Sequence, residues 1–158
     1  MSPQKVTRSV TRQATAPQPV PRDCPIADAL QIIGERWTLL AVREINYGVH
    51  RFEQIVANTG ASRDILAARL RGLESAGVIS RRQYSEHPPR YEYHLTAAGD
   101  ELRPVLLTLA QWGLRWARTQ NAPEAVLRHA CRHELEVDLR CRHCDESIVA
   151  GSYAIDNA

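Results

Sequence analysis

The segment VISRRQYSEHPPRYEYHLT, residues 78–96, is the feature that most limits what this chain can fold into. It holds two runs rich in β-branched and aromatic residues around a short tip, where Pro88 and Pro89 stand side by side. Two such runs with a short break between them predict a β-hairpin. Gly77 immediately precedes the first run and is well placed to end a helix. The fold must therefore pass from a helix directly into a hairpin.

Helical periodicity dominates the chain before this hairpin. We expect ordered structure to begin near Cys24 and to form helices over 25–33, 36–45 and 51–58, each followed within a few residues by a glycine. A fourth helix, 63–77, opens after Ser62, which is a good N-cap residue.

The fourth helix has two different sides. Apolar residues and one arginine share the first side: Ile65, Leu66, Arg69, Leu70 and Leu73. Small and polar residues share the opposite side: Asp64, Ala67, Ala68, Arg71 and Ser75. We expect the first side to face the core and the second to be open to a partner.

The segment after the hairpin predicts one long helix, which Thr96 caps and Pro104 kinks. One apolar stripe of it contains Leu102, Val105, Leu106, Leu109, Trp112 and Trp116. A second contains Leu107, Ala110, Leu114 and Ala117. A small domain covers only one stripe of a surface helix, so the second predicts contact with another subunit.

The order of helices, tight turn, helix and hairpin makes the function readable. In a helix-turn-helix the second helix enters the major groove with its N-terminal residues toward the bases. Ala67 and Ala68 there can contact thymine methyls, and Ser62 can bond to phosphates or bases. The hairpin would be a wing on the adjacent DNA, stiffened by its prolines. The DNA-binding candidates are Arg51, Ser62, Arg63, Asp64, Ala67, Ala68, Arg71, Arg81, Arg82 and Arg90.

Three blocks of the sequence resemble a known family. CPIADALQIIGERWTLLAVREI, RFEQIVANTGASRDILAARLRGLESAGVISR and YEYHLTAAGDELRPVLLTLAQWG are similar to successive blocks of the HxlR-type winged-helix transcriptional regulators, bacterial relatives of the MarR group. The similarity runs from about Asp23 to Trp116. It includes the Cys-Pro opening, Gly34 with Arg36 and Trp37, Arg51 with Phe52, Ser62, Gly77 and the Tyr-x-Leu-Thr-x-x-Gly motif that ends at Gly99.

The resemblance implies a mainly α fold with a β-hairpin wing, a winged helix-turn-helix whose first and last helices build a homodimer. Such a dimer would bind a pseudo-palindromic operator on double-stranded DNA, with half-sites about one helical turn, roughly 34 Å, apart or a multiple of that. Asp64 departs from the family pattern, because a basic or amide residue is more usual there. An acidic side chain repels phosphate or accepts from a cytosine amino group, which leaves the operator sequence open.

Length and composition agree with one such domain. We expect a disordered basic tail over 1–22, a winged-helix and dimerisation domain over 23–121 and a cysteine-containing hairpin and tail over 122–158. No apolar run approaches the roughly 18 residues of a membrane span, and the N-terminus lacks a secretory signal, so a cytoplasmic protein without a membrane partner is expected. The net charge of +2 permits a nucleic-acid partner without requiring one.

Cys24 is a candidate redox sensor. Family members with Cys-Pro at this position include sensors of electrophiles or oxidants. A thiol at a helix N-terminus is stabilised as the thiolate by unpaired N–H groups and by the helix dipole, and Arg22 would add to this. The alternative is an inert, half-buried thiol. A small effector is a further candidate regulator, but the tryptophans near the long helix are more often core than pocket lining, so no effector residue is assigned.

The C-terminal region carries a second cysteine group on an expected β-hairpin. His129 and Cys131, followed by Cys141 and Cys144, resemble the two ligand pairs of a zinc ribbon, although His133 or His143 could replace His129. No cofactor is required by the rest of the sequence. Zinc here would be structural, since four protein ligands leave no open position. The alternatives are a disulfide or plain reduced thiols.

Three classes of function compete. The first is a sequence-specific DNA-binding regulator that uses the helix after Ser62 and the wing, and we expect it to be a repressor. The second is a winged-helix module that binds proteins and has lost operator binding, for which Asp64 and the modest net charge argue. An enzyme ranks last, because no nucleophile and base stand at suggestive spacing and no phosphate-binding glycine loop is present.

Overall fold

The computed structural model describes residues 23–119 and 125–154, and the expected basic tail over 1–22 lies outside the described residues. Helix α1 (Pro25–Ile33) begins after Cys24 and ends at Gly34, which confirms the expected bounds. Helix α2 (Arg36–Asn46) is the central element and packs against α3, α4, α6 and strand β2. Its residues Ala41, Val42 and Ile45 are buried.

Helices α3 (Phe52–Thr59) and α4 (Arg63–Ser75) form a helix-turn-helix. Gly60 closes α3 with a φ of 72°, a left-handed conformation that glycine adopts without strain. The Ser62 hydroxyl then accepts a hydrogen bond from the Ile65 N–H at 3.4 Å, so Ser62 is the N-cap of α4. Leu66, Leu70 and Leu73 bury one side of α4 in the core.

Glu44 of α2 forms a side-chain hydrogen bond with α3. Its side chain is nearly buried, and its carboxylate accepts from Asn58 Nδ2 at 2.7 Å and from Arg43 Nη2 at 2.5 Å. A buried carboxylate is costly unless it is hydrogen-bonded and paired, and both conditions are met here. The Asn58–Glu44 bond connects α3 to α2 at the edge of the core.

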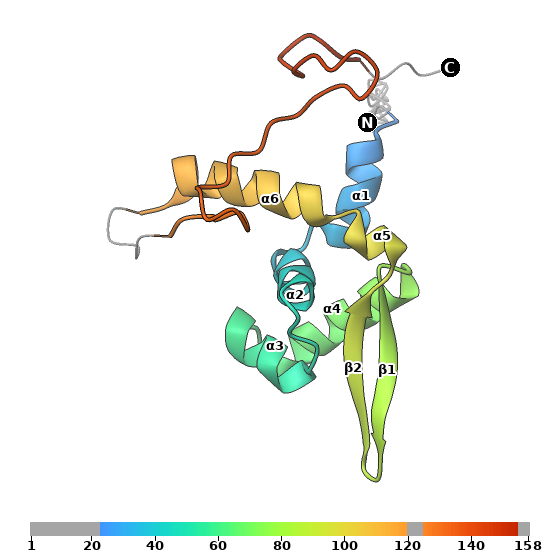
Figure 1. Cartoon of the computed structure of the whole chain (residues 1–158). Coiled ribbons are helices and arrows are strands. Elements are labelled where there is room, and N and C mark those ends of the chain that lie inside the picture. Colours follow the sequence, from blue (N-terminus) through green and yellow to red (C-terminus); the bar gives the residue numbers. More distant parts are fainter. Residues whose placement is uncertain (1–22, 120–124, 155–158) are drawn as a thin grey trace, which may run out of the picture.

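The hairpin forms as expected from strands β1 (Ile79–Glu86) and β2 (Pro89–Leu95). The strands are antiparallel, with Ile79 opposite Leu95 and with an irregularity between Gln83 and Ser85. The chain just before α3 pairs with the outer side of β2: Arg51 forms a β-bridge with Glu92, and the Tyr93 N–H donates to the His50 carbonyl at 2.9 Å. The hairpin projects away from the helices and ends in a narrow tip (Figure 1).

The expectation of one long kinked helix after Thr96 was wrong. The chain forms a short helix α5 (Ala97–Asp100), breaks at Glu101 and Leu102, and starts again as α6 (Arg103–Trp112), followed by a π-helical turn η1 (Gly113–Ala117). Pro104 lies in the first turn of α6, where a residue without an N–H costs nothing. The proline therefore begins a helix instead of bending one.

The core consists of side chains from α2, α3, α4 and β1. Its buried members are Ala41, Val42, Ile45, Ile55, Ala61, Leu66, Leu70, Leu73, Val78 and Ile79, and Leu102 and Leu106 pack against them. Gly99 allows α5 to approach the start of the hairpin, since a Cβ on it would lie 2.2 Å from the Val78 carbonyl oxygen. The result is a mainly α winged helix with one two-stranded sheet.

The C-terminal segment 125–154 is built differently. None of its residues is buried, and it contains isolated bridges at Arg128–Glu134 and Arg140–Ser147 but no regular strand. The expectation of a single C-terminal hairpin was therefore wrong. Each bridge closes its own short turn, because Arg132 and Asp145 adopt positive φ angles of 73° and 58° and reverse the chain locally. In the parts of the chain that the structure describes, no helix has the length and apolarity needed to cross a membrane.

Candidate nucleic-acid interface

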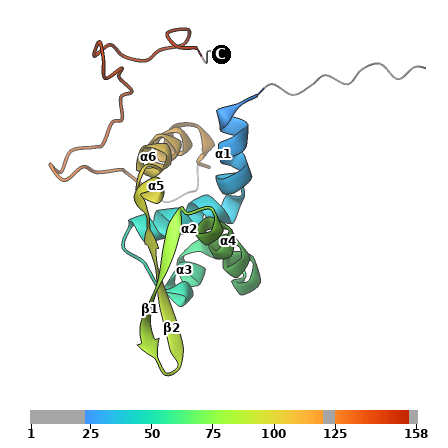
Figure 2. The same cartoon turned by 90° about the vertical axis from the view of Figure 1, so that its right-hand side faces the viewer.

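The N-terminal half of α4 presents an open surface. Ser62, Arg63, Asp64 and Ala68 are exposed, as the sequence predicts for residues that read DNA. The α3–α4 unit and the hairpin lie at the same end of the molecule, and α1 and α6 lie at the other (Figures 1 and 2). A duplex placed along α4 would therefore meet the wing as well.

Two residues of α4 differ from the expected faces. Ile65 was expected on the core side but is 41% exposed, whereas Ala67 was expected on the open side and is half-buried. The core side is centred on Leu66, Leu70 and Leu73, and Ile65 lies about 100° away from Leu66 around the helix. Ile65 was missed as a DNA-contact candidate, and the strict spacing of the leucines is the signal that could have found it. An exposed isoleucine there can contact a thymine methyl.

Arg63 is held by an acidic neighbour. Both of its terminal nitrogens bond to the Glu53 carboxylate of α3, one of them at 2.7 Å, and its guanidinium lies 5.2 Å from the centre of the Phe52 ring. The hydrogen bond from Arg63 lowers the pKa of Glu53, and the same bond raises the pKa of Arg63. Both side chains are exposed, so solvent screens the pair and a phosphate can replace the carboxylate.

Arg51 and Arg81 are also positioned by neighbours. Arg51 donates from Nε to Glu92 at 3.1 Å and stacks on Tyr84, with 4.8 Å between guanidinium and ring centre. Arg81 lies 3.6 Å from a Glu74 oxygen and 4.4 Å from the centre of the Tyr91 ring. Both arginines are thus held against the base of the wing.

A groove of about 540 Å³ separates the start of α3 from the wing. Arg51, Glu53 and Gln54 lie on its α3 side, and Tyr84 and Arg90 lie on its wing side. An opening lined by cations and hydrogen-bonding groups suits a nucleic-acid backbone. Gln54 and Tyr84 were not singled out from the sequence, because nothing in the linear order of residues shows that they meet.

Arg71, Arg82 and Arg90 complete the expected set. All three are exposed, and none forms an ion pair within residues 23–119 and 125–154. Arg90 lies beside the hairpin tip opposite Ser85, and Arg82 lies further down the hairpin opposite Glu92. These three cations are available to phosphates without breaking an existing pair.

Two histidines meet at the base of the wing. The rings of His50 and His94 stack with 4.2 Å between their centres, and His50 Nδ1 lies 2.8 Å from the Tyr93 carbonyl oxygen. Burial lowers the pKa of His94, and the nearby His50 and Arg82 add to this effect. The ring therefore favours its neutral form in the folded wing.

A second open surface is apolar and lies at the end opposite the wing. On α1, Ile26 and Leu30 are 64% and 54% exposed. Most of the first stripe, which runs from α6 into η1, is exposed as well, with Trp112 at 58% and Trp116 at 70%. Of that stripe only Leu102 and Leu106 reach the core, while Leu107, Ala110 and Leu114 of the second stripe are half-buried. The first stripe, which was expected to face the core, is thus mainly exposed to solvent.

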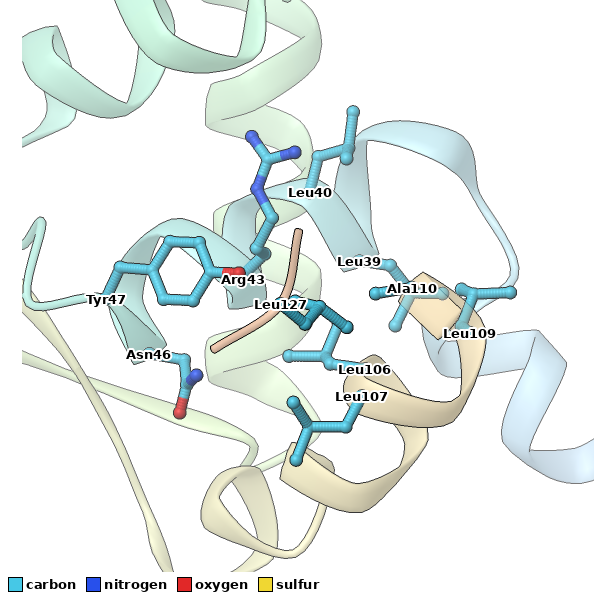
Figure 3. A pocket seen from close by; sticks show the side chains of 10 residues that line it. All are labelled: Leu39, Leu40, Arg43, Asn46, Tyr47, Leu106, Leu107, Leu109, Ala110 and Leu127. Atoms are coloured by element: carbon cyan, nitrogen blue, oxygen red, sulfur yellow. The ribbon is translucent and has the colours of Figure 1, made fainter. Parts of the chain in front are cut away.

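A cavity of about 220 Å³ lies between α2 and α6 (Figure 3). Leucines such as Leu39, Leu106 and Leu107 form its apolar wall, and Arg43, Asn46 and Tyr47 lie on another side. Leu127 of the C-terminal segment also lines it. The cavity could admit a small apolar molecule with one polar group.

The cysteines occupy two different environments. Cys24 is half-buried at the N-cap of α1, and its side chain forms no capping hydrogen bond. Arg22, expected to assist it, lies outside the described residues. In the C-terminal segment, His129 Nδ1 lies 3.1 Å from Cys131 Sγ. Hydrogen bonds from the backbone of Cys144 and then of His143 lower the pKa of Cys141.

The expected four-ligand cluster does not form within one chain. The His129–Cys131 pair and the Cys141–Cys144 pair belong to separate turns, which lie apart in both views (Figures 1 and 2). Over 23–119 and 125–154, no three metal-binding side chains of the His, Cys, Asp or Glu type come together.

Comparison with known proteins agrees with this geometry. Residues 32–121 match the model of the HxlR-like helix-turn-helix family. The HTH-type transcriptional regulator Rv3095 of Mycobacterium tuberculosis is 42% identical over 126 residues, which cover 79% of this chain and 80% of that protein.

Solved structures give the same assignment. The crystal structure of PA1607, described as a transcription factor, has a TM-score of 0.75 at 28% identity and covers 85% of this chain and 95% of that one. The redox regulator HypR in its oxidised form has a TM-score of 0.54 at 30% identity, covering 61% and 100%. The chain belongs to the HxlR-like helix-turn-helix family, and it is a transcriptional regulator with a DNA-binding winged helix, not an enzyme.

Proposed function

We propose that this regulator binds a pseudo-palindromic operator as a homodimer and represses transcription. The observation that carries the proposal is that α4 and the wing lie at the same end of the molecule. Their residues Arg71, Arg82 and Arg90 are exposed there and form no ion pair within the described residues. Phosphate contacts by such cations supply affinity and register.

Base readout would come from the first turns of α4. Asp64 and Ala68 point outward, and Ile65 is exposed beside them. Asp64 can accept from a cytosine amino group and Ile65 can contact a thymine methyl, so together they favour particular base pairs. Arg63 would exchange Glu53 for a phosphate, which is inexpensive because the pair is exposed.

The dimer would form through the exposed apolar faces of α1 and α6. Ile26, Leu30, Leu109, Trp112 and Trp116 would otherwise leave a large apolar area in water, and such areas mark interaction sites. A two-fold arrangement presents two α4 helices, with half-sites roughly 34 Å or a multiple of that apart.

A second candidate function is protein binding by a winged helix without operator recognition. The acidic neighbours favour it, because Glu53, Glu74 and Glu92 already occupy three of the expected DNA-contact arginines. Salt dependence separates the two functions, since affinity for DNA falls steeply as salt rises when several phosphates are neutralised.

Two routes of regulation are proposed for the same dimer. The similarity to the redox regulator HypR supports Cys24 as an oxidant sensor at the start of α1. The cavity between α2 and α6 supports regulation by a small apolar effector (Figure 3). A molecule bound there would contact both α2, at the centre of the core, and α6, which is proposed to form the dimer. A Cys24→Ser variant should lose any diamide response and keep basal DNA binding, and an unchanged response would remove Cys24 from the mechanism.

The test of the proposed function is fluorescence anisotropy on the DNA upstream of the protein's own gene, against an unrelated fragment of equal length. Tight binding that prefers the upstream fragment and weakens with salt is expected. An Arg71→Ala variant should weaken binding to both fragments, and Asp64→Asn should change the preference between them. Equal, weak binding to both fragments by the unmodified protein would instead favour the protein-binding function.

A further inference from the structure

The two turns of the C-terminal segment are built in a similar way, although the second is one residue longer. The first is closed by the Arg128–Glu134 bridge and the second by the Arg140–Ser147 bridge. In the first, the Arg132 N–H donates to the His129 carbonyl at 2.8 Å, and in the second the Asp145 N–H donates to the Cys141 carbonyl at the same distance. Both donors are the residues with positive φ. His129 and Cys141 thus each accept the bond that closes the turn, and Cys131 and Cys144 each stand immediately before the residue with positive φ.

Each turn presents a pair of side chains that bind soft metals. His129 Nδ1 and Cys131 Sγ lie 3.1 Å apart, on the same side of the first turn. In the second turn, Cys141 and Cys144 are separated by two residues, a usual spacing of a zinc ligand pair, and the bond from the Asp145 N–H to the Cys141 carbonyl closes the turn around them. Each pair supplies two of the four ligands of a tetrahedral zinc site, and three thiolates with one imidazole is a common structural set.

The first turn is attached to the body of its own chain. Leu127 enters the cavity between α2 and α6, as Figure 3 shows. Glu134 and Leu135 line a neighbouring depression together with Leu114 and Arg115. The first pair is therefore placed beside α6, which carries the apolar surface proposed to form the dimer.

The second turn leaves the body of its own chain. The segment between the turns runs outward, and the second turn lies at the α1 end of the molecule in both views (Figures 1 and 2). It has no core to stabilise it, because Leu139, Val149 and Tyr153 around it are 51%, 62% and 72% exposed. A turn of this size with uncovered apolar residues needs a metal, a partner or both.

We propose that the two turns are the halves of a structural zinc site that closes between two copies of this chain. His129 and Cys131 of one copy and Cys141 and Cys144 of the partner copy would bind each ion, so that a dimer carries two equivalent sites. Only a second copy offers the second turn both the missing ligand pair and an α6 face to cover its apolar residues. The inference rests on the homodimer of the proposed function.

Metal analysis of the full chain, purified without chelator, is the first test. Roughly one zinc per chain is expected, and Co²⁺ in its place should give the thiolate-to-metal absorption and the intense visible bands of a tetrahedral site. Cys131→Ser and Cys141→Ser should each lose the metal. Cys24→Ser and His133→Gln are matched controls that should keep it. Absence of zinc, or a Cys141–Cys144 disulfide in its place, would overturn the proposal.

Co-purification of two defective chains tests the exchange between copies. One chain carries Cys131→Ser, the other carries Cys141→Ser with Cys144→Ser, and different affinity tags allow the heterodimer alone to be isolated. In the proposed arrangement the heterodimer has one site with all four ligands and one with a single remaining ligand, so roughly one zinc per dimer should return. A site within one chain would be damaged in both copies, and no zinc would return.

These outcomes separate the inference from the proposed function. A wild-type dimer that binds its operator but shows no metal recovery in the heterodimer would overturn the zinc arrangement alone. A wild-type protein that sediments as a monomer with its zinc present would overturn both the dimer and the shared site. Circular dichroism of each variant checks that the winged helix remains folded.

Discussion

The winged helix over 25–117 and the C-terminal segment over 125–154 differ in what holds them together. The first has a connected core centred on α2 and α4, whereas the second contains no buried residue and is held by backbone hydrogen bonds and exposed ion pairs around two short turns. Burial of apolar surface is the main favourable term in folding, so the winged helix can be stable alone. By the same argument, we expect the C-terminal segment to depend on the zinc and the partner copy proposed above.

Removal of a core side chain should have the largest effect and should be confined to the first region. Leu70→Ala removes a fully buried side chain and should lower the free energy of unfolding by about 2–5 kcal/mol. Leu139→Ala, at an exposed position of the second region, should change the unfolding of the helices by less than about 0.5 kcal/mol. Urea unfolding in chelator-treated protein, followed by circular dichroism, measures both. Similar losses would show that the two regions share one core.

Removal of a wing cation should have the next largest effect. Arg90→Ala should cost about 1 kcal/mol of DNA affinity and reduce the slope of affinity against salt by about one, because one phosphate contact is lost. Arg128→Ala removes an equal charge from the C-terminal segment and should leave the slope unchanged. Anisotropy titrations over a salt series compare the two variants. A larger loss of affinity for Arg128→Ala would mean that the DNA contacts the C-terminal segment and not the wing.

Release of Arg63 should have a smaller effect of the opposite sign. Glu53→Gln removes the carboxylate that competes with phosphate for this arginine, so DNA affinity at low salt should rise by about twofold. Asp138→Asn breaks a comparable exposed pair with Arg140 in the C-terminal segment and should not change affinity. A decrease with Glu53→Gln would mean that the carboxylate positions Arg63 for binding.

The smallest effect should come from His94. Its pKa in the folded wing is lowered, so between that pKa and the unfolded value of about 6.5 the unfolded chain binds more protons. Stability should therefore rise with pH through this window and fall on acidification below about 6.5. His94→Gln should flatten that dependence, and His133→Gln in the C-terminal segment should not. Thermal unfolding between pH 5 and 8 checks this, and an unchanged slope in His94→Gln would contradict it.

The same contrast explains which features could be predicted from the sequence. Ser62 and Gly60 mark the turn between α3 and α4 because capping and left-handed turns depend on single residue types. The closing of the C-terminal turns could not be predicted, since Arg132 and Asp145 hold conformations that neither residue strongly signals. The role of Pro104 was predicted wrongly because a proline can either begin a helix or kink one, depending on the conformation of the backbone before it.

The DNA-binding role of the candidate residues stays a prediction, and their pairings could not be predicted from the sequence. The arginines of α4 and the wing lie where the pattern predicts, yet no local signal shows that Arg63 meets Glu53 or that Arg51 meets Glu92. Such pairs depend on the angle between elements, which packing of the whole core determines. Exposure of Ile65 was available in principle from the leucine spacing of α4.

The bond between the Tyr93 N–H and the His50 carbonyl joins the wing to the residue that leads into α3. Together with the Arg51–Glu92 bridge and the Glu44–Asn58 bond, it links the wing, α3 and α2 directly to one another. We therefore expect a regulatory signal to leave the arrangement of elements within one winged helix unchanged. In the proposed homodimer, the signal would instead alter the spacing and tilt between the two winged helices, so that each would fit its own half-site but both would not fit the operator at once.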